Sequence, residues 1–250
     1  MAHTVSWALA AVGIIFAAFV KGVTGLGFPV IGIPIAAQFL DPQTTVVAIS
    51  IPAFLMNLIQ AFQGGISLAM VRRFMPTMVC LIPGAIIGTA LLAKVPAALI
   101  TGILGFIVTL YAALSIWRLR LVLQPSQERQ AGVVVGLCGG LIGGATGMFS
   151  PPLVMYLTAL RLNKEAFVAA VSLCFIAGQI PQLLSLMGFH LITVPRLGMA
   201  ALFCLLSAVG FLVGLRLQRS ISQRVFAKGV LVMLLVVGLN LIRIGFMGWR

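Results

Sequence analysis

Two segments rich in glycine and proline carry the residue types best suited to holding a small anion. One runs from Lys21 to Pro29 and the other from Gly143 to Pro152, and each interrupts a long apolar run. Glycine and proline weaken a continuous helix, and proline suits the first turn of a new one. A helix that begins at such a break has free backbone N–H groups and a partial positive charge, which favour an anion. The alternative is that these residues only permit tight packing or kinks.

The residues expected to contact the anion are small, carry a hydroxyl group or begin a half-helix. Glycines let the backbone approach the solute closely, and Thr or Ser hydroxyls donate hydrogen bonds. These residues are Gly22, Thr24, Gly25 and Pro29 in the first segment, and Gly144, Thr146, Gly147, Ser150 and Pro151 in the second.

Lys21 lies beside the first break, and the next basic residue along the chain is Arg72. A lysine inside a membrane span costs roughly 2.5–3.5 kcal/mol on insertion scales, so an intramembrane charge is a functional candidate. One positive charge would suit an anionic substrate. The alternative is that Lys21 snorkels, with its ammonium group at the membrane interface.

Two amide pairs follow the breaks. Asn57 and Gln60 are spaced i, i+3, and so are Gln179 and Gln182, which places each pair on one face of a helix. Amides can line a polar path by donating hydrogen bonds without net charge. The alternative is that they join neighbouring helices.

The amino-acid composition indicates that membrane-spanning helices must position these residues. The chain has 250 residues, of which 62% are hydrophobic and 8% charged, whereas an ordinary soluble domain has about 25% charged residues. A soluble enzyme or binding module is therefore excluded, and the sequence predicts an all-α polytopic membrane protein. The net charge of +13 does not indicate nucleic-acid binding, because the basic residues occupy short gaps between apolar runs.

Enzymatic chemistry has no motif in this sequence. The three acidic residues, Asp41, Glu128 and Glu165, lie at predicted helix ends or in the linker, so no carboxylate is expected within a span. Cys80, Cys138, Cys174 and Cys204 lie inside apolar runs and form no CxxC pair. We therefore expect no enzymatic activity, no cofactor and no metal site.

The second segment repeats the first at a fixed distance. Adding 122 to positions 21–60 gives positions 143–182 without a gap, and ten of those 40 pairs are identical. The sequence thus predicts repeat 1 over 1–123, a linker over 124–130 and repeat 2 over 131–250. Each repeat would hold a broken helix, 5–40 or 131–160, and three transmembrane helices, at about 44–63, 74–93 and 97–117, and at about 166–189, 197–215 and 225–247.

The basic residues indicate how the repeats are oriented. If each broken helix is a hairpin that returns to its own side, 11 of the 15 basic residues other than Lys21 lie on one side of the membrane. If each broken helix crosses once, the split is 8 to 7. Cytoplasmic loops carry an excess of Lys and Arg, so hairpins are favoured, the repeats are inverted, and both termini are periplasmic. The tally does not separate re-entrant hairpins from hairpins that cross twice.

The pattern Gly-x-Thr-Gly…Pro occurs twice, at equivalent places in two halves that each contain four apolar runs. In this respect the chain, with its 250 residues, resembles the TauE/SafE family of sulfite exporters and probable sulfonate permeases. The resemblance covers essentially the whole chain. It implies a bacterial inner-membrane transporter of sulfur-containing anions such as sulfite or small organosulfonates. One departure is the second segment, which reads Gly147-Met-Phe-Ser-Pro-Pro where a glycine-richer run is expected.

Together these features predict a secondary transporter that exports its substrate by alternating access. Three alternatives stay open: an uptake permease that uses cysteines, a passive anion channel, and a membrane scaffold without flux. The expected partners are a small anionic substrate and the lipid bilayer, without nucleic acid. Assembly into a homo-oligomer stays open.

Overall fold

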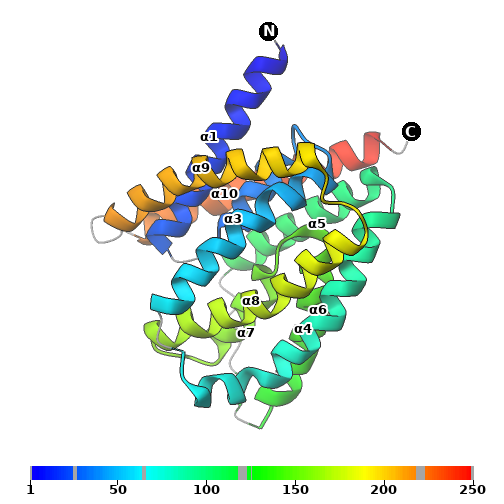
Figure 1. Ribbon diagram of the computed structural model, residues 1–250. Coiled ribbons are helices and arrows are strands. Elements are labelled where there is room, and N and C mark those ends of the chain that lie inside the picture. Colours follow the sequence, from blue (N-terminus) through cyan, green and yellow to red (C-terminus); the bar gives the residue numbers. More distant parts are fainter. Residues whose placement is uncertain are drawn as a thin grey trace. The chain divides into compact units, whose positions relative to one another are not determined.

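The computed structural model describes residues 2–24, 27–63, 66–117, 123–124, 126–217 and 223–248 (Figure 1). Within these ranges the chain forms ten helices and no strand. The helices are α1 (Ala2–Thr24), α2 (Phe28–Ala36), α3 (Pro42–Gln63), α4 (Leu68–Lys94), α5 (Ala97–Ile116), α6 (Glu128–Thr146), α7 (Ser150–Ala159), α8 (Lys164–Gly188), α9 (Val194–Leu217) and α10 (Gln223–Met247).

Six of the described helices are long and apolar enough to cross a membrane: α3, α4, α5, α8, α9 and α10. They correspond to the six transmembrane helices expected from the sequence, three on each side of the linker. The predicted all-α polytopic class is therefore confirmed. By contrast, α2 and α7 have nine and ten residues, about 15 Å each at 1.5 Å per residue, which is too short for a crossing.

The first broken helix folds back on itself. A Cβ atom at Gly32 of α2 would lie 3.5 Å from Ile14 and 3.6 Å from Ala17 of α1, and one at Gly13 would meet Ile35. Positions further along α2 thus contact positions further back along α1. The turn between the two helices includes Gly27, whose φ of 99° favours glycine.

The second broken helix folds back in the same way. A Cβ atom at Gly139 of α6 would lie 3.2 Å from Pro152, while one at Gly132 would lie 2.9 Å from the Tyr156 hydroxyl. The turn here uses Gly147, with φ 76°. Both breaks are therefore hairpin tips in the structure. The inverted relation of the two repeats and the side of the membrane that each tip faces stay predictions.

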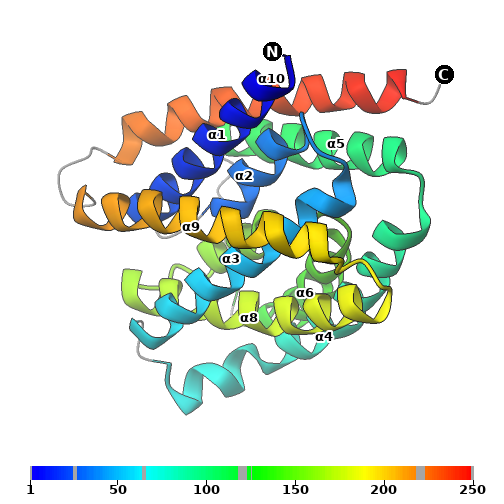
Figure 2. The same ribbon diagram turned by 45° about the horizontal axis from the view of Figure 1, so that its top comes forward.

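The chain forms two compact units that do not follow the order of the sequence repeats. Unit 1 comprises residues 1–52, 95–119 and 193–250, and unit 2 comprises 53–94 and 120–192. Within unit 1, α1 packs against α9 (Figure 1) and α5 packs against α10 (Figure 2). Within unit 2, α6 packs against α4. Each hairpin thus packs against a helix from the other half of the sequence.

Glycines bring the helix backbones close together at equivalent places in the two units. A Cβ atom at Gly88 of α4 would lie 3.0 Å from Gly144 Cα of α6, and one at Gly214 of α9 would lie 2.9 Å from Gly22 Cα of α1. Gly22 and Gly144 are partners at the 122-residue offset, and Gly88 and Gly214 occupy matching GxxxG patterns. Small residues at this spacing are typical of close helix packing in membranes, and the two crossings are counterparts.

Two helices begin with a side-chain N-cap. The backbone N–H of Thr44 donates to Asp41 Oδ1 at 2.9 Å, and that of Ala166 donates to Asn163 Oδ1 at 2.8 Å. Two helices begin earlier than expected: α4 begins at Leu68 and not near position 74, and α6 begins at Glu128, within the predicted linker 124–130. Arg73, which lies just before the predicted span of about 74–93, is helical and forms a bidentate ion pair with Glu128 at 2.6 and 2.9 Å.

Candidate functional site

The first hairpin tip, in unit 1, holds a buried lysine. Lys21 lies one turn before the end of α1 and is 1% exposed. Among the described residues it is the only charged side chain that is buried. A snorkelling lysine would expose its ammonium group, so this burial favours the functional interpretation of Lys21.

The other residues predicted to contact the anion at this tip differ in what they contact. The Thr24 hydroxyl donates to Val20 O at 2.8 Å, so donation to an anion requires that bond to be exchanged. Gly22 faces α9, where a Cβ atom would lie 2.5 Å from Phe211 O, which assigns Gly22 to helix packing. Pro29 is buried in the first turn of α2. Gly25 lies outside the described residues.

The second tip, in unit 2, is held by its own hydrogen bonds. Gly147 N–H donates to Gly143 O at 2.7 Å, and the Thr146 hydroxyl donates to Ile142 O at 2.6 Å. Thr146 Oγ1 also accepts from Met148 N–H at 3.3 Å. Gly144 packs on α4, while Ser150 and Pro151 begin α7 and are buried. The Thr146 hydroxyl, like that of Thr24, is thus used within its own helix.

The predicted amides gather in unit 2 on the second part of α3 and on α8. Asn57 Nδ2 donates to Gln179 Oε1 at 2.9 Å, and Gln182 Nε2 donates to Gly143 O at 2.9 Å. Gln60 is 6% exposed, and the other three amides are more deeply buried. The structure therefore brings Asn57 and Gln179 together and ties Gln182 to the second tip. These bonds give the amides a role in joining helices, which is the alternative stated above.

The two tips differ in how many backbone donors they offer. The first four N–H groups of a helix have no partner inside that helix. At α2 these positions are Gly27, Phe28, Pro29 and Val30, and at α7 they are Phe149, Ser150, Pro151 and Pro152. Because proline has no N–H, the first tip keeps three of these donors and the second keeps two.

Phe149 is a residue of the second tip that the sequence interpretation missed. It is 3% exposed, and its ring lies against two glycines. A Cβ atom would lie 2.5 Å from the ring Cγ if added at Gly143, and 2.6 Å from Cε1 if added at Gly178. The sequence held two signals for this contact. Positions 143 and 178 are glycines, and Phe149 stands where the first repeat has Gly27.

We expect Gly143→Ala to destabilise the protein by about 1–3 kcal/mol, because the added methyl group overlaps the Phe149 ring. In a Phe149→Ala background, Gly143→Ala should cost much less, because the ring is gone. The measurement is a thermal melt of the four proteins of this double-mutant cycle. Additive effects of the two substitutions would contradict this packing.

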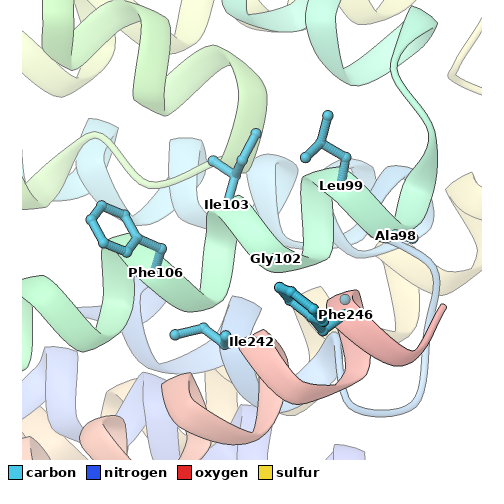
Figure 3. Close-up of a pocket in the computed structure, with 8 residues that line it drawn as sticks. Ala98, Leu99, Gly102, Ile103, Phe106, Ile242 and Phe246 are labelled. Carbon is cyan, nitrogen blue, oxygen red and sulfur yellow. The ribbon is translucent and has the colours of Figure 1, made fainter. Parts of the chain in front are cut away.

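An apolar groove in unit 1 is not a candidate anion site. It lies in unit 1 between α5 and α10 and has a volume of about 590 Å³. Figure 3 shows its lining, which includes Leu99, Phe106, Ile242 and Phe246 and contains no polar side chain. A groove without a hydrogen-bond donor cannot compensate the desolvation of an anion.

The features described so far define a helical multi-pass membrane protein with two broken-helix hairpins, one of which holds a buried lysine. A family model described as "Sulfite exporter TauE/SafE" matches residues 9–241. The chain therefore belongs to the TauE/SafE family of membrane transporters. No curated protein and no solved structure was found to match it.

Proposed function

We propose that this chain is a secondary transporter that exports a small sulfur-containing anion, such as sulfite or an organosulfonate, across the bacterial inner membrane. The single observation that carries the proposal is the buried Lys21 at a hairpin tip. A buried lysine near the end of α1, followed by a helix whose first N–H groups have no partner within that helix, is suited to an anionic solute. Membership of a sulfite exporter family supports the same substrate class.

In this proposal the two tips have different tasks. Lys21 and the first turn of α2 hold the negative charge. The buried polar groups of unit 2 serve the path of the substrate once their present hydrogen bonds exchange. They belong to Asn57, Gln60, Thr146, Ser150, Gln179 and Gln182. Gly22 and Gly144 are left out, because their surroundings assign them to helix packing.

Alternating access would arise from movement of the two repeats relative to each other, as in other transporters built from inverted repeats. The matching glycine crossings of α1 with α9 and of α6 with α4 support equivalent repeats. An inside-negative membrane potential favours the exit of an anion by about 2.3 kcal/mol per charge per 100 mV. We therefore propose the potential as a driving force for export.

The substrate class is tested by thermal shift of the purified protein with sulfite, methanesulfonate, sulfate and acetate. A ligand that binds only the folded state adds about 2.7 kcal/mol of stability at 100 times its Kd. We expect sulfite or methanesulfonate to raise the melting temperature more than acetate does. A protein stabilised by cations and by none of these anions would contradict the proposal.

A further inference from the structure

Each of the two units combines helices from both halves of the sequence. Unit 1 joins residues 1–52 and 95–119 to 193–250, and unit 2 joins 53–94 to 120–192. Closely packed helices inside a unit, such as α1 with α9 and α4 with α6, therefore come from different predicted repeats. If one whole repeat moved against the other, these contacts would have to break.

In unit 2 a close backbone crossing and an ion pair join the two halves. A Cβ atom at Gly84 of α4 would lie 3.0 Å from Gly140 Cα of α6. Nearer the beginning of the same two helices, Arg73 and Glu128 form the bidentate ion pair described above. Such a pair fixes the orientation of its partners as well as their distance. These contacts hold α4 and α6 together as one body.

In unit 1 polar side chains join the two halves. Arg196, in the first turn of α9, donates from Nε to Thr44 Oγ1 at 3.1 Å and from Nη2 to Gln43 Oε1 at 2.9 Å. Asn240 of α10 donates from Nδ2 to Gln38 Oε1. Hydrogen bonds between side chains stabilise helix packing in a membrane. Together with the glycine crossing of α1 and α9, they hold unit 1 together as a second body.

Helix α3 passes from one unit to the other. Among the helices that the structure describes, α3 alone belongs to both units, because the first segment of unit 1 ends at Pro52 and unit 2 begins at Ala53. Proline has no N–H, so the helical hydrogen bond to the Ala48 carbonyl is missing there, and helices kink at such positions. Hinges are a few residues that absorb a change in backbone angles. The boundary between the units thus falls where α3 can bend.

We infer that units 1 and 2 are the two bodies that move in the transport cycle, with a hinge in α3 at Pro52. This inference rests on the proposed transport function and specifies the movement between the repeats. Each hairpin carries with it the helices of the other half against which it packs: the first hairpin moves with α9, and the second moves with α4. The contacts inside each unit persist throughout the cycle.

The first test is cross-linking in a full chain whose four native cysteines are replaced by alanine. Arg73→Cys with Glu128→Cys, and Gln43→Cys with Arg196→Cys, each place two thiols in different halves but in one unit. With either pair joined by a short bismaleimide, methanesulfonate flux in proteoliposomes should stay within about two-fold of that in the same variant treated with N-ethylmaleimide. Block of flux by either cross-link would overturn the inference.

Pro52→Ala tests the hinge. Alanine restores the backbone hydrogen bond to Ala48, and bending must then break it, so the turnover of methanesulfonate should fall about five-fold without a change in KM. The matched control is Pro83→Ala, because Pro83 lies inside α4 and wholly within unit 2. Wild-type turnover in Pro52→Ala, or an equal loss in Pro83→Ala, would refute the hinge.

Distances between spin labels test the two bodies without any flux. Arg72 and Arg129 are exposed and come from different halves of unit 2, whereas Trp117 is exposed and shares a half with Arg72 but lies in unit 1. In the cysteine-free chain, labels on Arg72→Cys and Arg129→Cys should keep one narrow distance distribution with and without methanesulfonate. Labels on Arg72→Cys and Trp117→Cys should give a broader distribution, because their units move.

The reverse result, or equally narrow distributions for both pairs of labels, would overturn the inference. The expected distances in a chain that transports no sulfur-containing anion would instead count against the proposed function.

Discussion

Lys21→Gln is expected to abolish saturable flux of sulfite or methanesulfonate in proteoliposomes while leaving the protein folded. Glutamine keeps most of the length of the side chain and a hydrogen-bond donor but removes the charge. A hydrogen bond that involves a charged group contributes up to about 3 kcal/mol. Loss of the charge-assisted bond from Lys21 to the anion should therefore weaken anion binding about a hundred-fold. The measurement is the initial rate of uptake over a range of anion concentrations.

The matched control for this substitution is Lys94→Gln. Lys94 ends α4 and is exposed, so the same chemical change should leave the flux unaltered. The melting temperature of Lys21→Gln should not fall greatly, because a neutral side chain is less costly to bury than an ammonium group. Wild-type flux in Lys21→Gln would refute the role of this lysine.

Gly88→Ala and Gly214→Ala are each expected to destabilise the protein by about 1–3 kcal/mol. At Gly88 the new methyl group would lie 2.8 Å from Ala145 N, and at Gly214 it would lie 2.9 Å from Gly22 Cα. These are backbone atoms, so relief requires the helices to separate. Thermal melts of the variants in one detergent measure the effect.

Gly198→Ala provides the control on α9 itself. A Cβ atom at Gly198 meets nothing within 4 Å, and alanine stabilises a helix relative to glycine by up to about 1 kcal/mol. Its melting temperature should therefore match or exceed that of the wild type. If Gly214→Ala behaves like Gly198→Ala while Gly88→Ala is destabilised, the two crossings are not energetically equivalent.

The fold was largely predictable because the signals for a membrane protein are local. Long apolar runs predict spans. The glycine and proline breaks predict an interruption within each broken helix, and α1 and α6 do end at Thr24 and Thr146, inside these breaks. The start of α4 was placed too late, since apolar length alone says nothing of polar turns that extend beyond a span. The pairing of α1 with α9 was not predictable, because it depends on contacts between distant segments.

The candidate site was predictable only in part. The residue types were visible in the sequence, and Lys21 stood out as a lone charge. The partners of the hydroxyl and amide groups were not visible: Thr24 and Thr146 donate to carbonyls of their own helices, and Gln182 donates to a carbonyl of α6. Which of several nearby acceptors a polar side chain uses depends on backbone geometry, which the sequence specifies only through the whole fold.

The most direct test of anion export is flux through the purified protein in proteoliposomes under an imposed membrane potential. With methanesulfonate inside, an inside-negative potential should accelerate its efflux, and the rate should saturate with concentration and move one negative charge per anion. A flux that rises without saturation would indicate a channel. The absence of methanesulfonate or sulfite flux at any potential, from protein shown to be folded, would contradict the account.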